Sequence, residues 1–383
     1  MRGHRGRQGP RRLPGGAGAP ARGALLTRTE RLAETLGEHE LDGLLVSDLV
    51  NLRYLTGFTG TSGLAVIGAG GDGARVFITD FRYVERAAAE VEGYEQLRGE
   101  RELLASVAPA LPDRAPLRLG FDDAHLPVRR HARLREALPE AVDLVAAGGL
   151  VEALRMVKDP GELARIRAAA ELADDAFRAT LEGGLKGRTE RAVALELEDR
   201  MRRDGAEPSF PSIIAAGAHG ALPHAEPRDV EIPADALVVV DWGARLQGYC
   251  SDCTRTVATG SIDGDAAEVY ELVRRAQAAA LAAVRPGPSG REVDAVAREL
   301  IAAAGHGERF GHGLGHGVGL EVHEGPRLAA SDETALRPGN VVTVEPGVYL
   351  PGRFGVRIED LVAVTAGGTE VFSGVGKELL EID

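Results

Sequence analysis

The pattern of the sequence changes near Lys158, and this change limits the folds that the chain can adopt. Between residue 25 and about residue 150, short apolar runs with strand character alternate with amphipathic stretches of helical period. The predicted strands cover 41–46, 63–67, 75–79 and 117–121, and the predicted helices cover 28–38, 81–90 and 127–137. Strands that alternate with helices predict an α/β domain over residues 25–150.

The second part of the chain opens with a strong helix-start signal. Asp159 suits the N-cap, Pro160 the first helical position, and Glu162 the first turn. A long helix is therefore predicted to about Glu182, and further helices over 189–203, 264–284 and 289–304. Strands and glycine-rich loops follow Pro208. A chain of 383 residues is expected to form about two domains, and the second, over 155–383, is predicted to be α+β.

Composition narrows the class of protein. Hydrophobic residues make up 44% and charged residues 27% of the chain, as in an ordinary soluble globular protein. No apolar stretch approaches the ~18 residues that span a bilayer, so no membrane partner is expected. Two cysteines, Cys250 and Cys253, are too few for a disulfide scaffold and favour a reducing cytoplasm.

Charge is unevenly distributed along the chain. The net charge is −13, yet residues 1–24 carry six arginines and no acid, so the body is more acidic still. An acidic body argues against nucleic acid as the main partner. Residues 1–24 are rich in Arg, Gly, Pro and Ala, which predicts a disordered tail, and no apolar h-region of a signal peptide follows Arg11-Arg12. An RNA-contacting arm and an over-extended start remain as alternatives.

The segment FGHGLGHGVGLEVHEGP, residues 310–326, gathers three histidines among glycines: His312, His316 and His323. Imidazole is a common metal ligand and titrates near neutral pH. Glycines allow the backbone to approach whatever the histidines hold. Three histidines in this setting indicate a site rather than isolated core or surface residues.

Two aspartates lie on a predicted hairpin over residues 236–258. With Leu246-Gln247 as its loop, Asp241 faces Asp252 directly. Like charges in facing positions are destabilising, so a cation is expected between them; the alternative is a turn with two solvated aspartates. Cys250 and Cys253 point to opposite faces of this strand, so we expect two small buried residues rather than a redox pair.

Two glutamates also lie on strands that read as buried. Glu345 follows the apolar run VVTV, and Glu359 lies within VRIEDLVAV. Alone, each could be a salt-bridged core acid. With the aspartates and a histidine they form a set suited to Mn²⁺, Co²⁺, Zn²⁺ or Fe²⁺. Four acids would over-neutralise one ion, whereas two ions about 3.5–4 Å apart fit the set better.

The order D-x-G, S-D-x-T-R-T, H-G-x-G-H-G-x-G-L-x-x-H-E, E-P-G and R-I-E-D resembles the dinuclear metallopeptidases of the pita-bread fold, over residues 150–383. That family includes methionine aminopeptidase, Xaa-Pro dipeptidase (prolidase) and aminopeptidase P. The upstream segments NLRYLTGFTGTSG and FITDFRYVERA are similar to the N-terminal α/β domain of the Xaa-Pro members. The resemblance implies a creatinase/prolidase-like α/β domain followed by an α+β pita-bread catalytic domain.

The resemblance also implies which residues form a metal centre. The implied ligands of two divalent ions, with Mn²⁺ favoured over Co²⁺ or Zn²⁺, are Asp241, Asp252, His316, Glu345 and Glu359. In the family, a water or hydroxide that bridges the two ions attacks the carbonyl of the bond that precedes proline. Glu345 matches the acid that is both a ligand and a proton shuttle.

The resemblance also implies which other side chains lie on the substrate side of the site. His323 and His224 match catalytic histidines on the substrate side of the family's active site. His312 and Arg357 match residues that line the substrate pocket and support the metal centre. His219 and His306 match nothing and are expected at the surface.

The expected function is that of a metal-dependent Xaa-Pro aminopeptidase acting on proline-containing peptides. The alternative is an Xaa-Pro dipeptidase. A dipeptidase would need a feature that closes the far end of the cleft, and the sequence shows none, which favours the aminopeptidase. More remote alternatives are a non-catalytic pita-bread binding protein and a metal-free enzyme like creatinase, and the complete ligand set argues against both. By analogy, the resemblance implies a homodimer or larger homo-oligomer.

Overall fold

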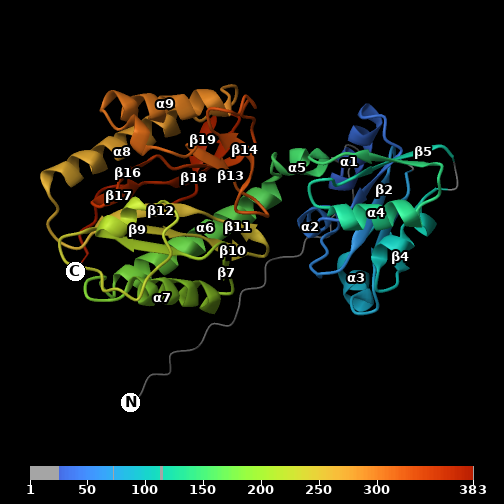
Figure 1. Ribbon diagram of the computed structural model, residues 1–383, viewed down its shortest axis with the longest axis horizontal. Helices are drawn as coiled ribbons and strands as arrows, with labels where there is room; N and C mark the ends of the chain where they lie inside the picture. The colour runs from blue at the N-terminus through green and yellow to red at the C-terminus, as the bar shows by residue number, and fades with distance from the viewer. Residues whose placement is uncertain (1–25, 72, 113–114, 383) are drawn as a thin grey trace, which may run out of the picture.

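The computed structural model describes residues 26–71, 73–112 and 115–382, and the predicted disordered tail lies outside these ranges. The described chain forms two lobes, with helix α5 (Leu150–Arg155) between them (Figure 1). The N-terminal lobe is built on one mixed sheet. The C-terminal lobe is a layered arrangement of sheets and helices.

The N-terminal lobe confirms the predicted α/β domain. Its six-stranded sheet has the order β4-β3-β2-β1-β5-β6, with antiparallel pairing of β1 with β2 and of β2 with β3 and parallel pairing elsewhere. The strands are β1 (Gly43–Val46), β2 (Leu64–Gly68), β3 (Arg75–Thr79), β4 (Glu95–Arg98), β5 (Leu117–Phe121) and β6 (Val142–Ala146). The helices are α1 (Arg28–Glu38), α2 (Leu49–Thr56), α3 (Val84–Glu90) and α4 (Val128–Ala137), with 3-10 turns at Leu103–Ser106 and Ala108–Ala110.

The predicted helix start at Asp159 is confirmed. Asp159 accepts a hydrogen bond from the backbone N–H of Glu162, whose carboxylate accepts one from the N–H of Asp159 at 3.0 Å. This reciprocal pair satisfies two N–H groups that the first turn leaves unpaired. The four long helices of this lobe are α6 (Pro160–Leu181), α7 (Glu190–Arg203), α8 (Gly264–Ala283) and α9 (Gly290–Ala303).

The strands of the C-terminal lobe form four sheets. A three-stranded sheet contains β12 (Cys253–Ala258), β9 (Leu237–Trp242) and β8 (Ile213–Ala216), and another contains β11 (Tyr249–Cys250), β10 (Ala244–Leu246) and β7 (Glu207–Pro208). A five-stranded sheet contains β14 (Glu324–Leu328), β13 (Gly315–Gly317), β15 (Val341–Val344), β18 (Asp360–Thr365) and β19 (Gly368–Val371). β16 (Gly347–Leu350) pairs with β17 (Phe354–Arg357), and short 3-10 turns lie at Gly217–Ala221 and Gly307–Arg309.

Two pairs of helices enclose these sheets. α6 and α7 share a buried core with β8 and β9, whereas α8 and α9 share another with β15 to β18. Figure 1 shows one pair on each side of the strands. Burial of the apolar face of each pair supplies the main stabilisation, and the result is the expected pita-bread arrangement.

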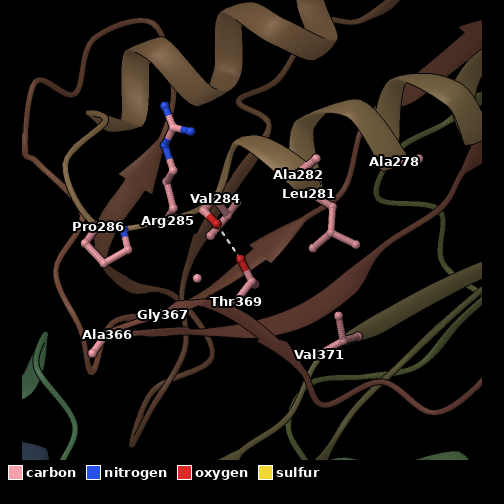
Figure 2. A pocket seen from close by; sticks show the side chains of 11 residues that line it. Ala278, Leu281, Ala282, Val284, Arg285, Pro286, Ala366, Gly367, Thr369 and Val371 are labelled. Atoms are coloured by element: carbon pink, nitrogen blue, oxygen red, sulfur yellow. Dashed lines mark hydrogen bonds between the residues drawn. The ribbon is translucent and has the colours of Figure 1, made fainter.

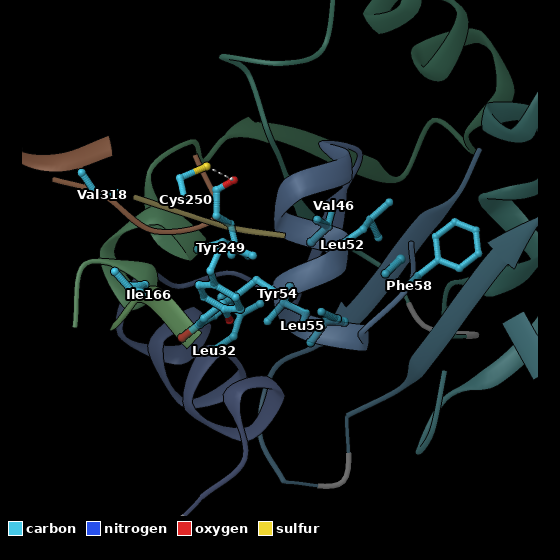
Figure 3. Close-up of a cluster of buried hydrophobic side chains, with 14 of the residues drawn as sticks. Leu32, Val46, Leu52, Tyr54, Leu55, Phe58, Ile166, Tyr249, Cys250 and Val318 are labelled. Atoms are coloured by element: carbon cyan, nitrogen blue, oxygen red, sulfur yellow. Dashed lines mark hydrogen bonds between the residues drawn. The ribbon is translucent and has the colours of Figure 1, made fainter. Parts of the chain in front are cut away.

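A third core joins the two lobes. Leu32, Tyr54 and Leu55 of the N-terminal lobe belong to the same buried cluster as Ile166 and Tyr249 of the C-terminal lobe (Figure 3). Polar contacts border it, including the Tyr249 hydroxyl, which donates to Glu162 Oε1 at 3.1 Å. The lobes are therefore held together by packed apolar surface.

The register of the β9–β12 hairpin corrects one prediction. Its loop is Gln247-Gly248, with φ of 52° and 92°, and not Leu246-Gln247. The two left-handed residues suit a two-residue hairpin turn. Asp241 therefore pairs with Thr254, and Asp252 lies two residues away on the same face. A slip of two positions preserves the face of every side chain, so the two aspartates still share one surface.

The two cysteines are free and buried, as expected for two small core residues. Cys250 Sγ contacts the carbonyl oxygen of Leu320, and Cys253 Sγ contacts that of Glu359. The helices of the described ranges include none that is long and apolar enough to cross a bilayer.

Candidate active site

Five side chains predicted from the sequence converge where the sheets of the C-terminal lobe meet. Asp241 is on β9, Asp252 lies in the break between β11 and β12, and His316 is on β13. Glu345 and Glu359 each follow a strand, β15 and β17 respectively. These positions span more than a hundred residues of sequence, so only the folded chain assembles them.

The backbone fixes where the two glutamates lie. The N–H of Glu345 donates to Leu314 O at 2.8 Å, and the N–H of Glu359 donates to Thr254 O at 3.0 Å. The pairing of β13 with β14 shifts register directly after His316. Such an irregularity turns a strand and re-aims its side chains, here at the point where His316 faces the carboxylates.

Short distances connect the imidazole with two of the acids. His316 Nε2 lies 3.3 Å from Glu345 Oε1 and 3.6 Å from Asp252 Oδ2. One possible ligand atom from each of Asp252, His316 and Glu359 lies within 4.8 Å of the others. His316 Nδ1 faces the carbonyl oxygen of Gly317 at 3.1 Å, so Nε2 is the nitrogen presented to the acids.

Arg357 supports the opposite side of the cluster. Its Nη2 donates to Asp241 Oδ2 at 2.6 Å, and its Nε donates to Thr254 Oγ1 at 3.0 Å. Thr254 in turn donates to Glu359 Oε2 at 2.7 Å. Arg357 therefore places one protein cation against Asp241, and its hydrogen bond to Thr254 extends this support to Glu359.

Two oxygens of the cluster stay without a protein partner. Asp241 Oδ1 and Glu359 Oε1 are buried and have no hydrogen bond within the described ranges. A buried carboxylate oxygen without a partner is costly. The site is therefore incomplete as a set of protein groups alone, and a bound cation would complete it.

The electrostatics of the acids support the same conclusion. Burial, followed by the charge of Glu359, raises the pKa of Asp252 well above its ordinary range. Burial and then Glu345 do the same to the pKa of Glu359. Burial raises the pKa of Asp241 despite the neighbouring Arg357. Repulsion among carboxylates in a dry site is relieved by a cation.

Glu345 is held in the ionised form. Burial acts to raise its pKa, but the hydrogen bond with His316 and that residue's charge lower it below the ordinary value. The Thr343 hydroxyl donates to Glu345 Oε1 at 3.0 Å and accepts from the His316 backbone N–H at 3.0 Å. Thr343 thus fixes the acid and the imidazole relative to one another.

His323 and His224 lie on the exposed side of the cluster. The ring of His323 meets that of His316 edge to face, with centroids 4.3 Å apart. Burial and the charge of His316 lower the pKa of His323, so it is neutral near pH 7. His224 is exposed on the loop after the 3-10 turn Gly217–Ala221. Both imidazoles are therefore accessible from solvent.

His312 is tied to Arg357 through Tyr349. The Tyr349 hydroxyl lies 3.0 Å from His312 Nε2 and accepts from Arg357 Nη1 at 3.0 Å. Burial lowers the pKa of His312. Tyr349, Thr254 and Thr343 were not predicted from the sequence. Thr254 could have been, because it lies two positions after Asp252 on the same strand face.

The expectation of a surface position for His219 is wrong, whereas His306 is partly exposed. The side chain of His219 is only 8% exposed, and its Nδ1 lies 2.9 Å from Glu190 Oε2. Arg228 donates to the same carboxylate through Nε and Nη2, each at 3.0 Å. His224 lies between these two partners in sequence, so Glu190 anchors both ends of its loop.

A large open hollow lies elsewhere, between the end of α8 and the β18–β19 hairpin (Figure 2). Its volume is about 770 Å³. Its lining includes Leu281, Val284 and Val371, and the hydroxyl of Thr369, another lining residue, donates to Val284 O. The labelled side chains are mostly apolar, with Arg285 as the charged one. The carboxylate cluster, rather than this hollow, is therefore the candidate active site.

Comparison with known families agrees with this geometry. Residues 164–366 match the model of metallopeptidase family M24, and residues 28–157 match the creatinase/prolidase N-terminal domain. The chain belongs to metallopeptidase family M24. All five residues of the cluster fall inside the matched catalytic region.

Individual relatives cover nearly the whole of this metallopeptidase. It is 43% identical over 354 residues to the uncharacterized peptidase YqhT of Bacillus subtilis, covering 92% of this chain and 99% of that one. It is similar to the structure of an Xaa-Pro dipeptidase from Bacillus anthracis, with 40% identity, a TM-score of 0.88 and coverage of 93% and 99%. It is also similar to an X-Pro aminopeptidase from Thermotoga maritima, with 33% identity, a TM-score of 0.82 and coverage of 93% and 100%.

Proposed function

We propose that this metallopeptidase is an Xaa-Pro dipeptidase that hydrolyses the bond between an N-terminal residue and a following proline. The observation that carries the proposal is the buried cluster of four carboxylates and His316, with two oxygens that lack a protein partner. Buried acids in such density require cations. Similarity to an Xaa-Pro dipeptidase supports the substrate class.

We propose Asp241, Asp252, His316, Glu345 and Glu359 as ligands of two divalent ions. The donor set fits them, since carboxylate oxygens and an imidazole suit Mn²⁺, Co²⁺ and Zn²⁺, and Mn²⁺ is our first choice. The unpartnered Asp241 Oδ1 and Glu359 Oε1 supply free lone pairs for that purpose. Ions bound there would supply Lewis-acid activation of water and of the scissile carbonyl near neutral pH.

Glu345 is the proposed proton carrier. Its carboxylate is ionised, and Thr343 holds Oε1 in place. In this role it accepts the proton of the attacking water and passes it to the prolyl nitrogen as that nitrogen leaves. A group that transfers the proton in both steps must lie beside the nucleophile, and Glu345 lies 3.3 Å from the His316 imidazole at the centre of the cluster.

His323 and His224 are the proposed substrate-side groups. A neutral His323 can donate a hydrogen bond to the carbonyl oxygen as negative charge develops on it. His224 approaches from another loop, which Glu190 anchors through His219 and Arg228. Arg357 acts through Asp241 and Thr254 rather than on the substrate, because its three nitrogens already donate to protein oxygens. His312 is proposed to line the pocket with one face of its ring.

The dipeptidase is better supported than the aminopeptidase expected from the sequence. The dipeptidase structure is more similar to this chain than the aminopeptidase structure, by 40% against 33% identity. The resemblance by motif is common to both activities and could not distinguish them. Proline-containing peptides as substrates, a homo-oligomeric assembly and a cytoplasmic location remain parts of the proposal.

Peptide length tests the dipeptidase proposal directly. We expect the metallated protein to cleave Xaa-Pro at least about tenfold faster, by kcat/KM, than Xaa-Pro-Yaa-Zaa, since about 1.4 kcal/mol of transition-state discrimination suffices for that ratio. Release of the N-terminal residue from both peptides, measured by chromatography, gives the two rates. Xaa-Ala peptides of the same lengths are the control for the proline requirement. Equal or faster cleavage of the longer peptide would establish the aminopeptidase instead.

A further inference from the structure

A second group of acids and one histidine lies in the N-terminal lobe, away from the carboxylate cluster. It consists of Asp122 and His125, which follow β5, and Glu152 on α5. One possible ligand atom from each lies within 4.8 Å of the other two. Asp48, the N-cap of α2, lies beside them. Three separate segments of the lobe therefore present their polar side chains to one point.

The histidine has a carboxylate on each side of its ring. His125 Nδ1 lies 3.7 Å from Asp48 Oδ1, and His125 Nε2 lies 3.8 Å from Glu152 Oε1. A metal-binding imidazole commonly donates its second N–H to a carboxylate, which fixes the ring and its tautomer. Asp48 lies on the Nδ1 side, slightly beyond hydrogen-bond distance, and a small rotation would bring it into that role. Nε2 remains for a ligand role toward Glu152 and Asp122.

Asp122 supplies an independent observation. Its side chain is buried, with the residue 5% exposed, and its Oδ1 has no hydrogen-bond partner in the part of the chain that the structure describes. Burial, and then the charge of Glu152, raises the pKa of Asp122 to about 6. A buried carboxylate oxygen without a partner is costly. Asp122 thus brings a buried carboxylate with an unpartnered oxygen to the group that His125 and Glu152 complete.

The neighbouring amide and guanidinium do not neutralise these acids. Asn51 Nδ2 donates to Glu152 Oε1 at 2.7 Å and approaches Asp122 Oδ2 at 3.4 Å. Arg155 donates a hydrogen bond through Nη1 to Asn51 Oδ1, and hydrogen bonds through Nη2 to the carboxylates of Glu321 and Glu324. Its charge is therefore directed toward the C-terminal lobe, and the acids around His125 retain a negative surplus.

We propose that Asp122, His125 and Glu152 bind a divalent cation of the Zn²⁺ class, with Asp48 orienting His125. Ligands about 2.0–2.1 Å from one tetrahedral ion lie about 3.3 Å from each other. Closing the 3.8 Å between His125 and Glu152 to that value needs a shift of roughly half an ångström. Partly exposed side chains can make such a shift by small rotations, and the exposure of His125 and Glu152 gives the ion a route from solvent.

The ion would fasten the connection between the lobes. Glu152 belongs to α5, and Arg155 at the end of the same helix binds Glu324, the neighbour of His323. Lys158 binds Glu324 as well, at 2.7 Å. Metal in the N-terminal lobe would therefore stabilise the linker on which the His323 segment rests. Its role is structural, and it lies beyond the proposed peptidase reaction.

Zinc retention tests the proposal without using activity. The His316→Ala variant serves as the background, because it impairs the proposed catalytic centre. After dialysis against Zn²⁺ and then against metal-free buffer, we expect His316→Ala/His125→Ala to retain about one Zn²⁺ per chain less than His316→Ala, measured by plasma mass spectrometry. The exposed His39→Ala, added to the same background, is the control and should leave retention unchanged.

Thermal unfolding supplies a second readout for the same variants. Zn²⁺ should raise the Tm of His316→Ala by several degrees, because an ion that binds only the folded chain stabilises it. This rise should disappear with His125→Ala and also with Glu152→Gln, which removes the charge and preserves the shape. Circular dichroism confirms that each variant is folded. Equal zinc retention and equal Tm shifts with and without His125 would overturn the proposal.

Discussion

Glu345→Gln should lower kcat by at least about a thousandfold, because general acid–base groups contribute roughly 10²–10⁴ and here one group serves both proton transfers. Glutamine keeps the size of the side chain, and its amide oxygen can still accept from Thr343. The fold should therefore be preserved. Steady-state hydrolysis of Xaa-Pro by freshly metallated protein, with its circular dichroism spectrum, measures both effects.

The control for this variant is Glu140→Gln, which makes the same chemical change at an exposed position of the N-terminal lobe. It should retain the kcat of the unmodified protein. Metal content is measured in parallel, since Glu345 is also a proposed ligand. A metallated Glu345→Gln variant with near-normal kcat would disprove the proton-carrier role.

Arg255→Met should lower the free energy of unfolding by about 3–5 kcal/mol, because it leaves Asp360 Oδ1 and several buried backbone oxygens without their donor. Arg255 is 2% exposed, and its Nη2 donates to Asp360 Oδ1 at 2.8 Å. Its other nitrogens donate to the backbone oxygens of Glu359 and Gly376. Methionine restores the apolar bulk of the side chain but none of these bonds, and Asp360 keeps only Lys377 and Gln277 as partners.

The chain contains a natural probe for this measurement. Its one tryptophan, Trp242, is buried and stacks on Phe177 with ring centroids 3.9 Å apart. Its fluorescence during urea unfolding gives the change in stability. The matched control is Arg133→Ala, which removes an exposed ion pair with Glu102 and should cost at most about 1 kcal/mol. A loss below about 1 kcal/mol for Arg255→Met would contradict the account of this buried network.

Helices of the C-terminal lobe could be predicted because their signals are local. The capping pair of Asp159 and Glu162 and the apolar period after it fix the start of α6. Short elements were missed: α5 has six residues, and α2, β4 and β6 are also brief. An apolar period needs several turns to become visible in a short helix, and the edge strands β4 and β6 are largely exposed, so they lack a clear apolar pattern.

The hairpin shows how a local signal was misread. The turn that forms is Gln247-Gly248, and a glycine in the second loop position is typical of a two-residue hairpin. The prediction of Leu246-Gln247 as the loop did not place Gly248 in the turn. The prediction that Asp241 and Asp252 share a face still holds, because side chains alternate between the two faces of a strand and the register error was two positions rather than one.

The contacts that support the site could not be predicted from the sequence. Glu190 and His219 are 29 positions apart and meet only because α7 packs beside the loop after β8. Tyr349 joins Arg357 to His312 through a hydroxyl whose direction depends on the fold of β16 against β17. The acids themselves could be predicted, since a carboxylate on an apolar strand needs a partner.

Metal content of two histidine variants tests the central claim most directly, namely that His316 belongs to the metal centre and His323 to the substrate side. After reconstitution with Mn²⁺ and removal of free ions, His316→Ala should lose at least about one ion per chain and its peptidase activity. His323→Ala should keep the metal content of the unmodified protein while its kcat falls about a hundredfold or more. Equal loss of metal in the two variants would contradict the account.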